Sequence, residues 1–203
     1  MATTAAPYGL RPVKRADGMP YAGATSQYLI DPAGEATNLF YSQVVIIGAD
    51  GYIALATGTG ADLTTNSISG TTGVGAIGVF VGCEYVNSSG QTVQAQYYPS
   101  GTANGGAIKA YVVDDPNVLF QAQLDGSGAQ TVIGTNTFFA AAQSTSTGST
   151  TTGNSTSALD ATVQTAAAAF RIVAHVSPAS DAYPDVLVKF NPGAHQMTNN
   201  VGL

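Results

Sequence analysis

Short apolar runs separated by turn residues are the feature that most constrains the fold of this chain. The runs are rich in Val, Ile, Phe and Tyr, and none keeps the periodicity of an amphipathic helix over a helical length. This pattern predicts an all-β fold, either a β-sandwich or a barrel, with a jelly roll as the favoured single topology. The predicted strands are 25–30, 39–47, 52–56, 76–86, 91–98, 108–113, 117–124, 169–177 and 185–191.

Two tight turns join neighbouring runs into predicted hairpins. Gly48-Ala49-Asp50-Gly51 separates the runs 39–47 and 52–56, and Asn87-Ser88-Ser89-Gly90 separates the runs 76–86 and 91–98. Asp-Gly tolerates the positive φ that a two-residue hairpin turn requires.

Residues 1–24 contain three prolines and three glycines and show no sustained periodicity. Because proline fixes φ and biases the preceding residue toward extended backbone, this segment is predicted to be an extended arm outside the core. The predicted body is a single β domain over residues 25–203. It carries an exposed Ser/Thr/Gly-rich loop at 144–157 and a tail at 192–203 that runs over a neighbour or over the body.

The few charges are unevenly distributed along the chain. Charged residues make up 9% of the sequence, against about 25% in ordinary soluble domains. Arg11, Lys14 and Arg15 are three of the six cations, whereas residues 16–203 hold three cations and twelve acids, a balance of −9. An acidic body argues against nucleic-acid binding, which needs a broad positive surface. It allows a basic arm that docks on an acidic protein.

Two tyrosines strengthen the interpretation of the arm as an interface. Tyr8 and Tyr21 lie within it, and aromatic side chains are favoured at interfaces because they bury a large area and keep a polar group. The predicted contact residues are Tyr8, Arg11, Lys14, Arg15 and Tyr21.

Asp114 and Asp115 are the strongest candidates for chemistry, as paired carboxylates followed by Pro116 and Asn117. Adjacent residues of a strand point to opposite faces, so the two carboxylates would not converge on one ion. Asp, Pro and Asn also build β-turns, and Asp115 can accept hydrogen bonds from backbone amides beyond it. A turn is therefore favoured over a metal or acid–base site.

The other potential sites lack the context that their chemistry requires. Cys83 has no second cysteine to pair with and lies in an apolar run, which predicts a buried small side chain. The glycines of 73–78 mimic a dinucleotide fingerprint but lead into a strand rather than a helix. His175 and His195 stand apart. The sequence predicts no enzyme, cofactor or metal, and it contains neither a transmembrane stretch nor a signal peptide.

Two segments keep alternative predictions. Residues 137–143 suit a strand or a short helix, and the alanine-rich residues 158–169 suit a helix or an extended connection equally.

Six segments, in order along nearly the whole chain, resemble a family of tailed-bacteriophage virion proteins, the capsid decoration or cement proteins. They are APYGLRPVKRADGMPY, GVFVGCEYV, YYPSGT, VVDDPNVLFQAQLDG, TGNSTSALD and YPDVLVKFNPGAHQ. The run after Gln143 is longer than the family pattern.

The resemblance implies a β-sandwich or jelly-roll body on the outer capsid surface of a virion, made in the host cytoplasm. It also implies an arm laid across the major capsid protein and a homo-oligomer, with a trimer favoured and a dimer as the alternative. A second hypothesis is a head-fibre or adhesin-type module that binds a receptor or glycan, based on the 144–157 tip and the tyrosines. A hydrolase using Asp114 or Asp115 is the third.

Overall fold

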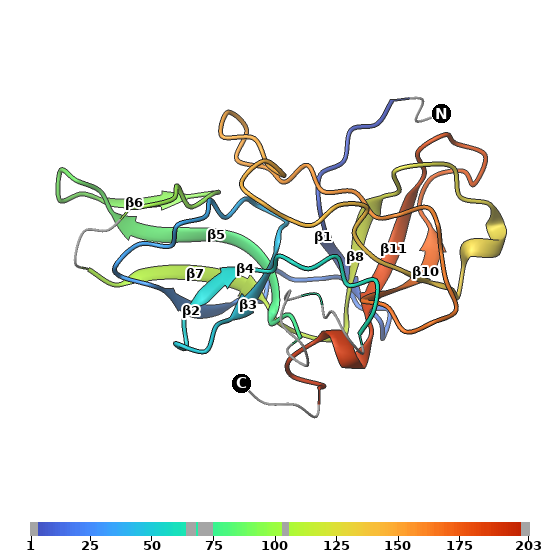
Figure 1. Cartoon of the computed structure of the whole chain (residues 1–203), viewed down its shortest axis with the longest axis horizontal. Coiled ribbons are helices and arrows are strands. Elements are labelled where there is room, and N and C mark those ends of the chain that lie inside the picture. The colour runs from blue at the N-terminus through green and yellow to red at the C-terminus, as the bar shows by residue number, and fades with distance from the viewer. Residues whose placement is uncertain (1–3, 64–67, 69–74, 103–105, 200–203) are drawn as a thin grey trace.

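The computed structural model describes residues 4–63, 68, 75–102 and 106–199, and it is built almost entirely from β-strands (Figure 1). Two sheets lie side by side along the length of the molecule. One sheet has the strand order β1–β8–β11–β10–β9, and the other has the order β3–β4–β2–β7–β5–β6. The all-β prediction is confirmed, whereas the jelly-roll topology is not.

The six-stranded sheet closes on itself into a small barrel, because β3 pairs with β5 as well as with β4. Strand β6 continues the sheet beyond the closure as the second strand of a hairpin with β5. The strands of this sheet are β2 (Ser26–Ile30), β3 (Val44–Ile47), β4 (Ile53–Leu55), β5 (Gly78–Val86), β6 (Thr92–Ala95) and β7 (Ile108–Val113). Both predicted hairpins are present, as β3–β4 and β5–β6.

The five-stranded sheet is open and antiparallel throughout. Its strands are β1 (Arg11–Arg15), β8 (Val118–Gln123), β9 (Asn136–Thr137), β10 (Phe170–His175) and β11 (Asp185–Phe190). The Asp114–Asn117 turn carries the chain from β7 in the barrel to β8 in this sheet, so the two sheets meet at one corner.

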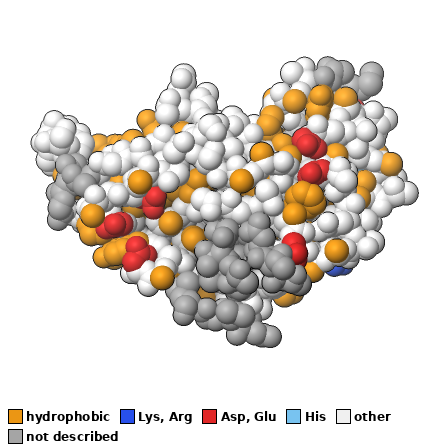
Figure 2. Space-filling view, viewed as in Figure 1, with side chains coloured by type: hydrophobic (Ala, Val, Ile, Leu, Met, Phe, Trp, Pro, Cys, Tyr) orange, Lys and Arg blue, Asp and Glu red, His pale blue; other side chains and the backbone are white. Residues whose placement is uncertain are grey.

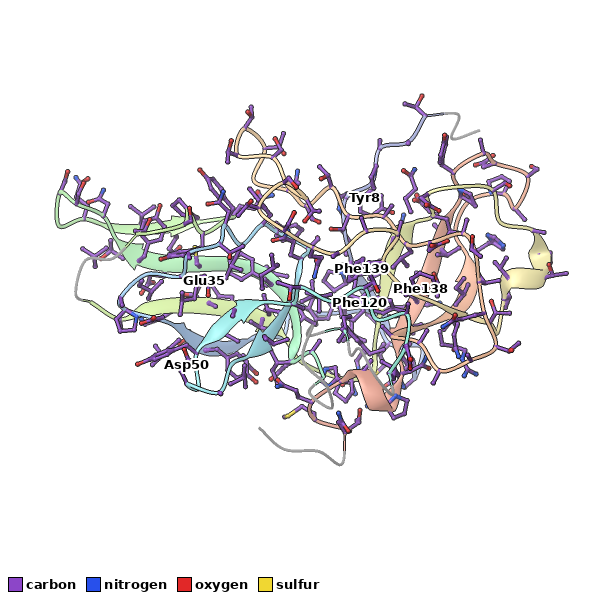
Figure 3. All side chains as sticks on the ribbon, in the orientation of Figure 1. Tyr8, Glu35, Asp50, Phe120, Phe138 and Phe139 are labelled. Atoms are coloured by element: carbon purple, nitrogen blue, oxygen red, sulfur yellow. The ribbon has the colours of Figure 1, made fainter. Side chains whose placement is uncertain are left out.

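The main core lies where the inner face of the open sheet packs against one end of the barrel. Its centre is a chain of phenylalanine rings, with Phe190 packed against Phe120 at 5.6 Å and against Phe170 at 5.0 Å between ring centroids. Phe139 extends the chain edge-on to Phe170 at 5.2 Å. Figure 3 shows Phe120 and Phe139 close together between the two sheets. A second cluster, which includes Phe80 and Tyr98, fills the barrel itself.

The described part of the tail, residues 192–199, runs over the body and links the two sheets. It begins with the 3-10 turn η2 (Pro192–Ala194). The Gln196 amide donates to the Ala76 carbonyl at 2.7 Å, and the Gln196 side chain bonds to both backbone groups of Ile47 at 3.3 Å. His195 is 1% exposed and packs edge-on against Phe190.

The structure contradicts the prediction that residues 1–24 lie outside the core. Strand β1 pairs with β8, and the preceding Leu10 is fully buried in the main core. Pro12 and Pro20 were two of the reasons for the wrong prediction. Pro12 is tolerated because β1 is an edge strand, where a missing N–H need not break the ladder. Pro20 ends the segment that folds back along β1, where it bridges to Lys14.

The Ser/Thr/Gly-rich loop at 144–157 is only partly exposed, which corrects the prediction of an exposed loop. Ser155 and Ser157 are buried, and the Tyr41 carbonyl accepts the Ser155 amide at 2.9 Å. Small side chains allow this close approach, because Gly148 lies directly against the Phe40 ring. Thr150–Thr152 form the exposed tip, which projects at the top of Figure 1.

Of the two ambiguous segments, 158–169 is an extended connection and 137–143 holds only the last residue of the short strand β9. Parts of the glycine pattern at 73–78 and of the termini lie outside the described residues. In the part of the chain that is described, no helix has the length and apolar character needed to cross a lipid bilayer.

Leu10→Ala is expected to destabilise the protein by about 2–5 kcal/mol, because it leaves a cavity in the main core. Urea unfolding measures this loss. Met19→Ala in the same segment is the control, since Met19 is 62% exposed and its loss should change stability by less than about 0.5 kcal/mol. Equal, small effects of both substitutions would show that the Leu10 side chain contributes nothing to the core.

Stability is expected to fall between about pH 6.5 and pH 4 because of His195. Burial lowers its pKa to about 4, with Asp114 and Asp115 opposing the shift weakly. Its Nδ1 accepts the Met197 amide at 3.2 Å, which also requires an unprotonated nitrogen. In this pH range the unfolded chain binds a proton that the folded chain does not, so acid removes on the order of 3 kcal/mol.

Urea titrations at several pH values, compared between the unmodified chain and His195→Gln, isolate this contribution. The variant should lose less stability than the unmodified chain between pH 6.5 and 4. Parallel curves would contradict the assignment.

Candidate docking interface

The five predicted contact residues separate into two groups. Arg11 and Lys14 lie on the outer face of the open sheet, as the register below establishes, and Tyr8 lies under Arg11. Arg15 and Tyr21 are instead engaged within the chain. Arg15 forms ion pairs with Asp17 and Asp115, each at 3.2 Å, and the Tyr21 hydroxyl donates to the Ala24 carbonyl at 2.7 Å.

Core packing determines which side chains of the open sheet face outward. Phe170 and Ile172 of β10, and Val188 and Phe190 of β11, belong to the main core. Because successive side chains of a strand alternate between faces, Arg171 and Lys189 must point to the outer face. The two are direct cross-strand partners.

Strand β1 contributes two more cations to the same face. Phe120 of β8 faces the core, so its neighbours Leu119 and Gln121 face outward. Lys14 pairs with Leu119 and Arg11 pairs with Gln121. The outer face therefore carries four of the six lysine and arginine residues of the chain, which we call the basic face: Arg11, Lys14, Arg171 and Lys189.

Three of these cations form a row across the sheet. Continuing the β8–β11 register by one residue places Lys189 beside Leu119, which is flanked on its other side by Lys14. Arg171 follows Lys189 on β10. The row Lys14–Leu119–Lys189–Arg171 crosses three strand spacings, or about 14 Å.

No described acid forms an ion pair with the basic face, although Asp185 of β11 lies on the same face beside Tyr8. Arg15 and Lys109, the two cations away from it, are both ion-paired, Lys109 with Glu84 at 2.8 Å. Among the described residues no acid lies within ion-pair distance of any cation of the basic face. In the view of Figure 2, acidic side chains appear at both ends of the molecule, whereas almost no lysine or arginine is visible. The acids Glu35 and Asp50 lie on the barrel (Figure 3).

The N-terminal residues cover one end of the outer face. The Ala6 amide donates to the Gln123 side chain at 2.8 Å, and the Arg11 guanidinium stacks 4.3 Å above the centre of the Tyr8 ring. Burial raises the pKa of the Tyr8 phenol, and the carboxylate of Asp185 raises it further. Tyr8 is therefore neutral and acts as a platform that fixes Arg11.

A pocket of about 430 Å³ opens at the far end of the basic row. Arg171 and Lys189 line it together with apolar atoms of Pro116, Val173 and Pro192, and none of the described residues of its wall is acidic.

A second, shallower groove lies on the barrel beside the β5–β6 hairpin, with a volume of about 560 Å³. Tyr41, Tyr111, Gln94 and Gln96 line it. The described residues of the groove carry aromatic and amide groups and no charged side chain, in contrast to the pocket on the open sheet.

The aspartates of the β7–β8 corner form a turn, as predicted. The Asp115 carboxylate accepts the Asn117 amide at 2.8 Å, and Asp114 accepts the Tyr28 hydroxyl at 2.8 Å. The two carboxylates thus serve separate partners. No group of three His, Cys, Asp or Glu side chains within the described ranges is placed to hold a metal ion. Cys83 is buried as expected, and burial raises its pKa to about 12.

The sequence analysis did not identify Arg171 and Lys189 as contact residues, because each is a single cation outside any cluster of charges along the chain. The signal was present in the alternation of FRIVAH and DVLVKF, where a single cation stands between apolar residues of each predicted strand. The pairing of the two strands, which brings the cations together, could not be read from either segment alone.

Comparison with known protein families, with curated proteins and with solved structures gives no match in any of the three.

Lys189→Gln is expected to stabilise the isolated chain by a few tenths of a kcal/mol, up to about 1, because it removes a like-charge cross-strand pair. The gain, measured from urea unfolding, should shrink at high salt. Lys109→Gln is the control, since it removes a cation that is paired with Glu84 and should give no gain. A loss of stability in Lys189→Gln at low salt would mean that Arg171 and Lys189 do not repel each other.

Proposed function

We propose that this chain is a structural protein of a virion, a decoration or cement protein that binds the outside of a shell built from a major capsid protein. The observation that carries the proposal is the basic face: four cations without an ion-pair partner among the described residues, on one face of the open sheet of a protein with a net charge of −6. Such segregation suits docking on an acidic protein surface, where complementary charge guides orientation and association.

The composition and the sequence resemblance support the same function. With only 9% charged residues, the surface is weakly protected against association, which suits a protein that works while covered by other subunits. The six segments that resemble the decoration proteins include both the first strand, in APYGLRPVKRADGMPY, and Lys189, in YPDVLVKFNPGAHQ.

The proposed mechanism needs no chemical step. Each copy docks through the basic face and meets further copies of itself, as a trimer or a dimer, so that one oligomer bridges several shell subunits. Once one copy has bound, the others bind at high effective concentration, and modest single contacts add up to a stable clamp against internal pressure.

Point substitutions test this function better than deletion of residues 1–24, which would also remove strand β1 and the buried Leu10. Purified chain is added to shells assembled from the major capsid protein encoded beside its gene, and bound protein is measured by cosedimentation. Binding should saturate at a fixed number of copies per shell. Arg11→Glu with Lys14→Glu should weaken it by about tenfold or more at low salt, since like charges then meet across the contact.

Lys109→Glu is the matched control, because it reverses a cation on the barrel, and it should leave shell binding unchanged. The absence of a capsid gene beside the gene of this chain would overturn the shell as its partner. Equal binding by the double variant and the unmodified chain would overturn the assignment of the basic face to the shell.

The barrel groove favours a second function, the receptor- or glycan-binding head fibre or adhesin. Tyr41 and Tyr111 offer aromatic faces, and Gln94 and Gln96 offer amide groups that can bond to hydroxyls. A chain of this kind would bind glycans through the groove and would not occupy a fixed set of shell sites through the basic face.

A further inference from the structure

Arg171 and Lys189 stand out within the basic face because they are direct partners across two antiparallel strands. Like charges placed directly opposite each other destabilise a sheet. Neither of them has an acidic partner among the described residues. The arrangement is unfavourable in the isolated chain and becomes favourable when one anionic group lies between the two cations.

The surroundings hold the two side chains in place without neutralising them. The Arg171 Nε donates to the Asn136 Oδ1 at 2.9 Å, and the Lys189 Nζ donates to the Asn117 Oδ1 at 3.2 Å. Asn136 is 5% exposed and is itself fixed, since its amide donates to the Ala166 carbonyl at 2.8 Å and its oxygen also accepts from Asn191 at 3.1 Å.

This anchoring leaves the guanidinium available for a planar anion. Only Nε of Arg171 is engaged, and within the described ranges its two Nη groups have no hydrogen-bond partner. A guanidinium binds a carboxylate through two parallel hydrogen bonds, and a nearby lysine adds a point charge.

The pocket indicates what carries the carboxylate. Its volume of about 430 Å³ exceeds that of a single small anion, and its walls include Pro116, Val173 and Pro192. Val173 is 41% exposed, so it offers apolar area that nothing in the described chain covers. An acidic residue next to an apolar one matches both parts of the pocket.

We propose that Arg171 and Lys189 form a clamp for a carboxylate on an acidic polypeptide segment of the shell partner, with an adjacent apolar side chain packed on Val173. The clamp rests on the proposed function for the identity of the partner. It lies at the end of the basic row that begins at Lys14, so the segment is expected to run across the open sheet from β10 to β1.

The clamp can be tested without the shell. The full-length chain is titrated with the dipeptide acetyl-Leu-Glu-amide while the Arg171 Nε–H and the Lys189 side-chain signals are followed by NMR. Saturable shifts are expected at both side chains with a dissociation constant in the millimolar range. The neutral acetyl-Leu-Gln-amide should give none, and Lys189→Gln should weaken the acidic dipeptide by about tenfold.

Two outcomes of this titration would overturn the clamp: no saturable shift at Arg171 and Lys189, or tighter saturable binding of inorganic phosphate than of the dipeptide. Sedimentation of the free chain adds a third. If the unmodified chain self-associates and Lys189→Gln abolishes this, the occupant is a second copy of the chain and not a shell segment.

The shell assay separates the clamp from the function on which it rests. Arg171→Lys keeps the charge and loses the two-bond geometry, so it should weaken shell binding by about tenfold, whereas Lys109→Gln should not. Unfolding in urea verifies that Arg171→Lys remains folded. If Arg171→Lys and Lys189→Gln bind shells normally and the unmodified chain shows no saturable shift with the dipeptide, the clamp is wrong. The proposed decoration function is then unaffected. If the chain binds the dipeptide but does not bind shells, the carboxylate site is supported and the shell is not its partner.

Discussion

The packing of Phe190 against Phe120 and Phe170 is the interaction on which the rest of the structure depends. The three rings line the inner face of the open sheet, and Val44, Val79 and Val113 of the barrel belong to the same core, which makes one body of the two sheets. The ring packing also decides the outer surface, because a strand that places Phe170 or Phe190 in the core must turn its neighbours, Arg171 and Lys189, away from it. The alternation of side chains along β10 and β11 therefore produces both the hydrophobic core and the charged face.

Local patterns predicted the strands well, because turn chemistry and apolar alternation are properties of short segments. The Asp50-Gly51 hairpin and the Asp115 turn were correct for this reason. Barrel closure depends on the pairing of β3 with β5, which no local pattern specifies. The first strand was missed because the prolines, the glycines and the missing periodicity of residues 1–24 predicted an arm, whereas an edge strand tolerates a proline.

Only part of the basic face was predicted, because sequence patterns show residues that are close along the chain and not those brought together by long-range pairing. Tyr8, Arg11 and Lys14 are close in sequence, so their cluster was visible, and the structure keeps them on one face. Arg15 and Tyr21 were assigned by proximity alone, but Arg15 is neutralised by Asp17 and Asp115. Arg171 and Lys189 reach the face through long-range pairing, which brings together residues far apart along the chain.

The basic face is assembled from the first strand and from two strands near the other end of the chain, with β8 from the middle between them. No continuous stretch of polypeptide contains it, so a nascent or misfolded copy presents scattered charges and no row. Under the proposed function, a shell that recognises the row would bind folded copies and not misfolded ones.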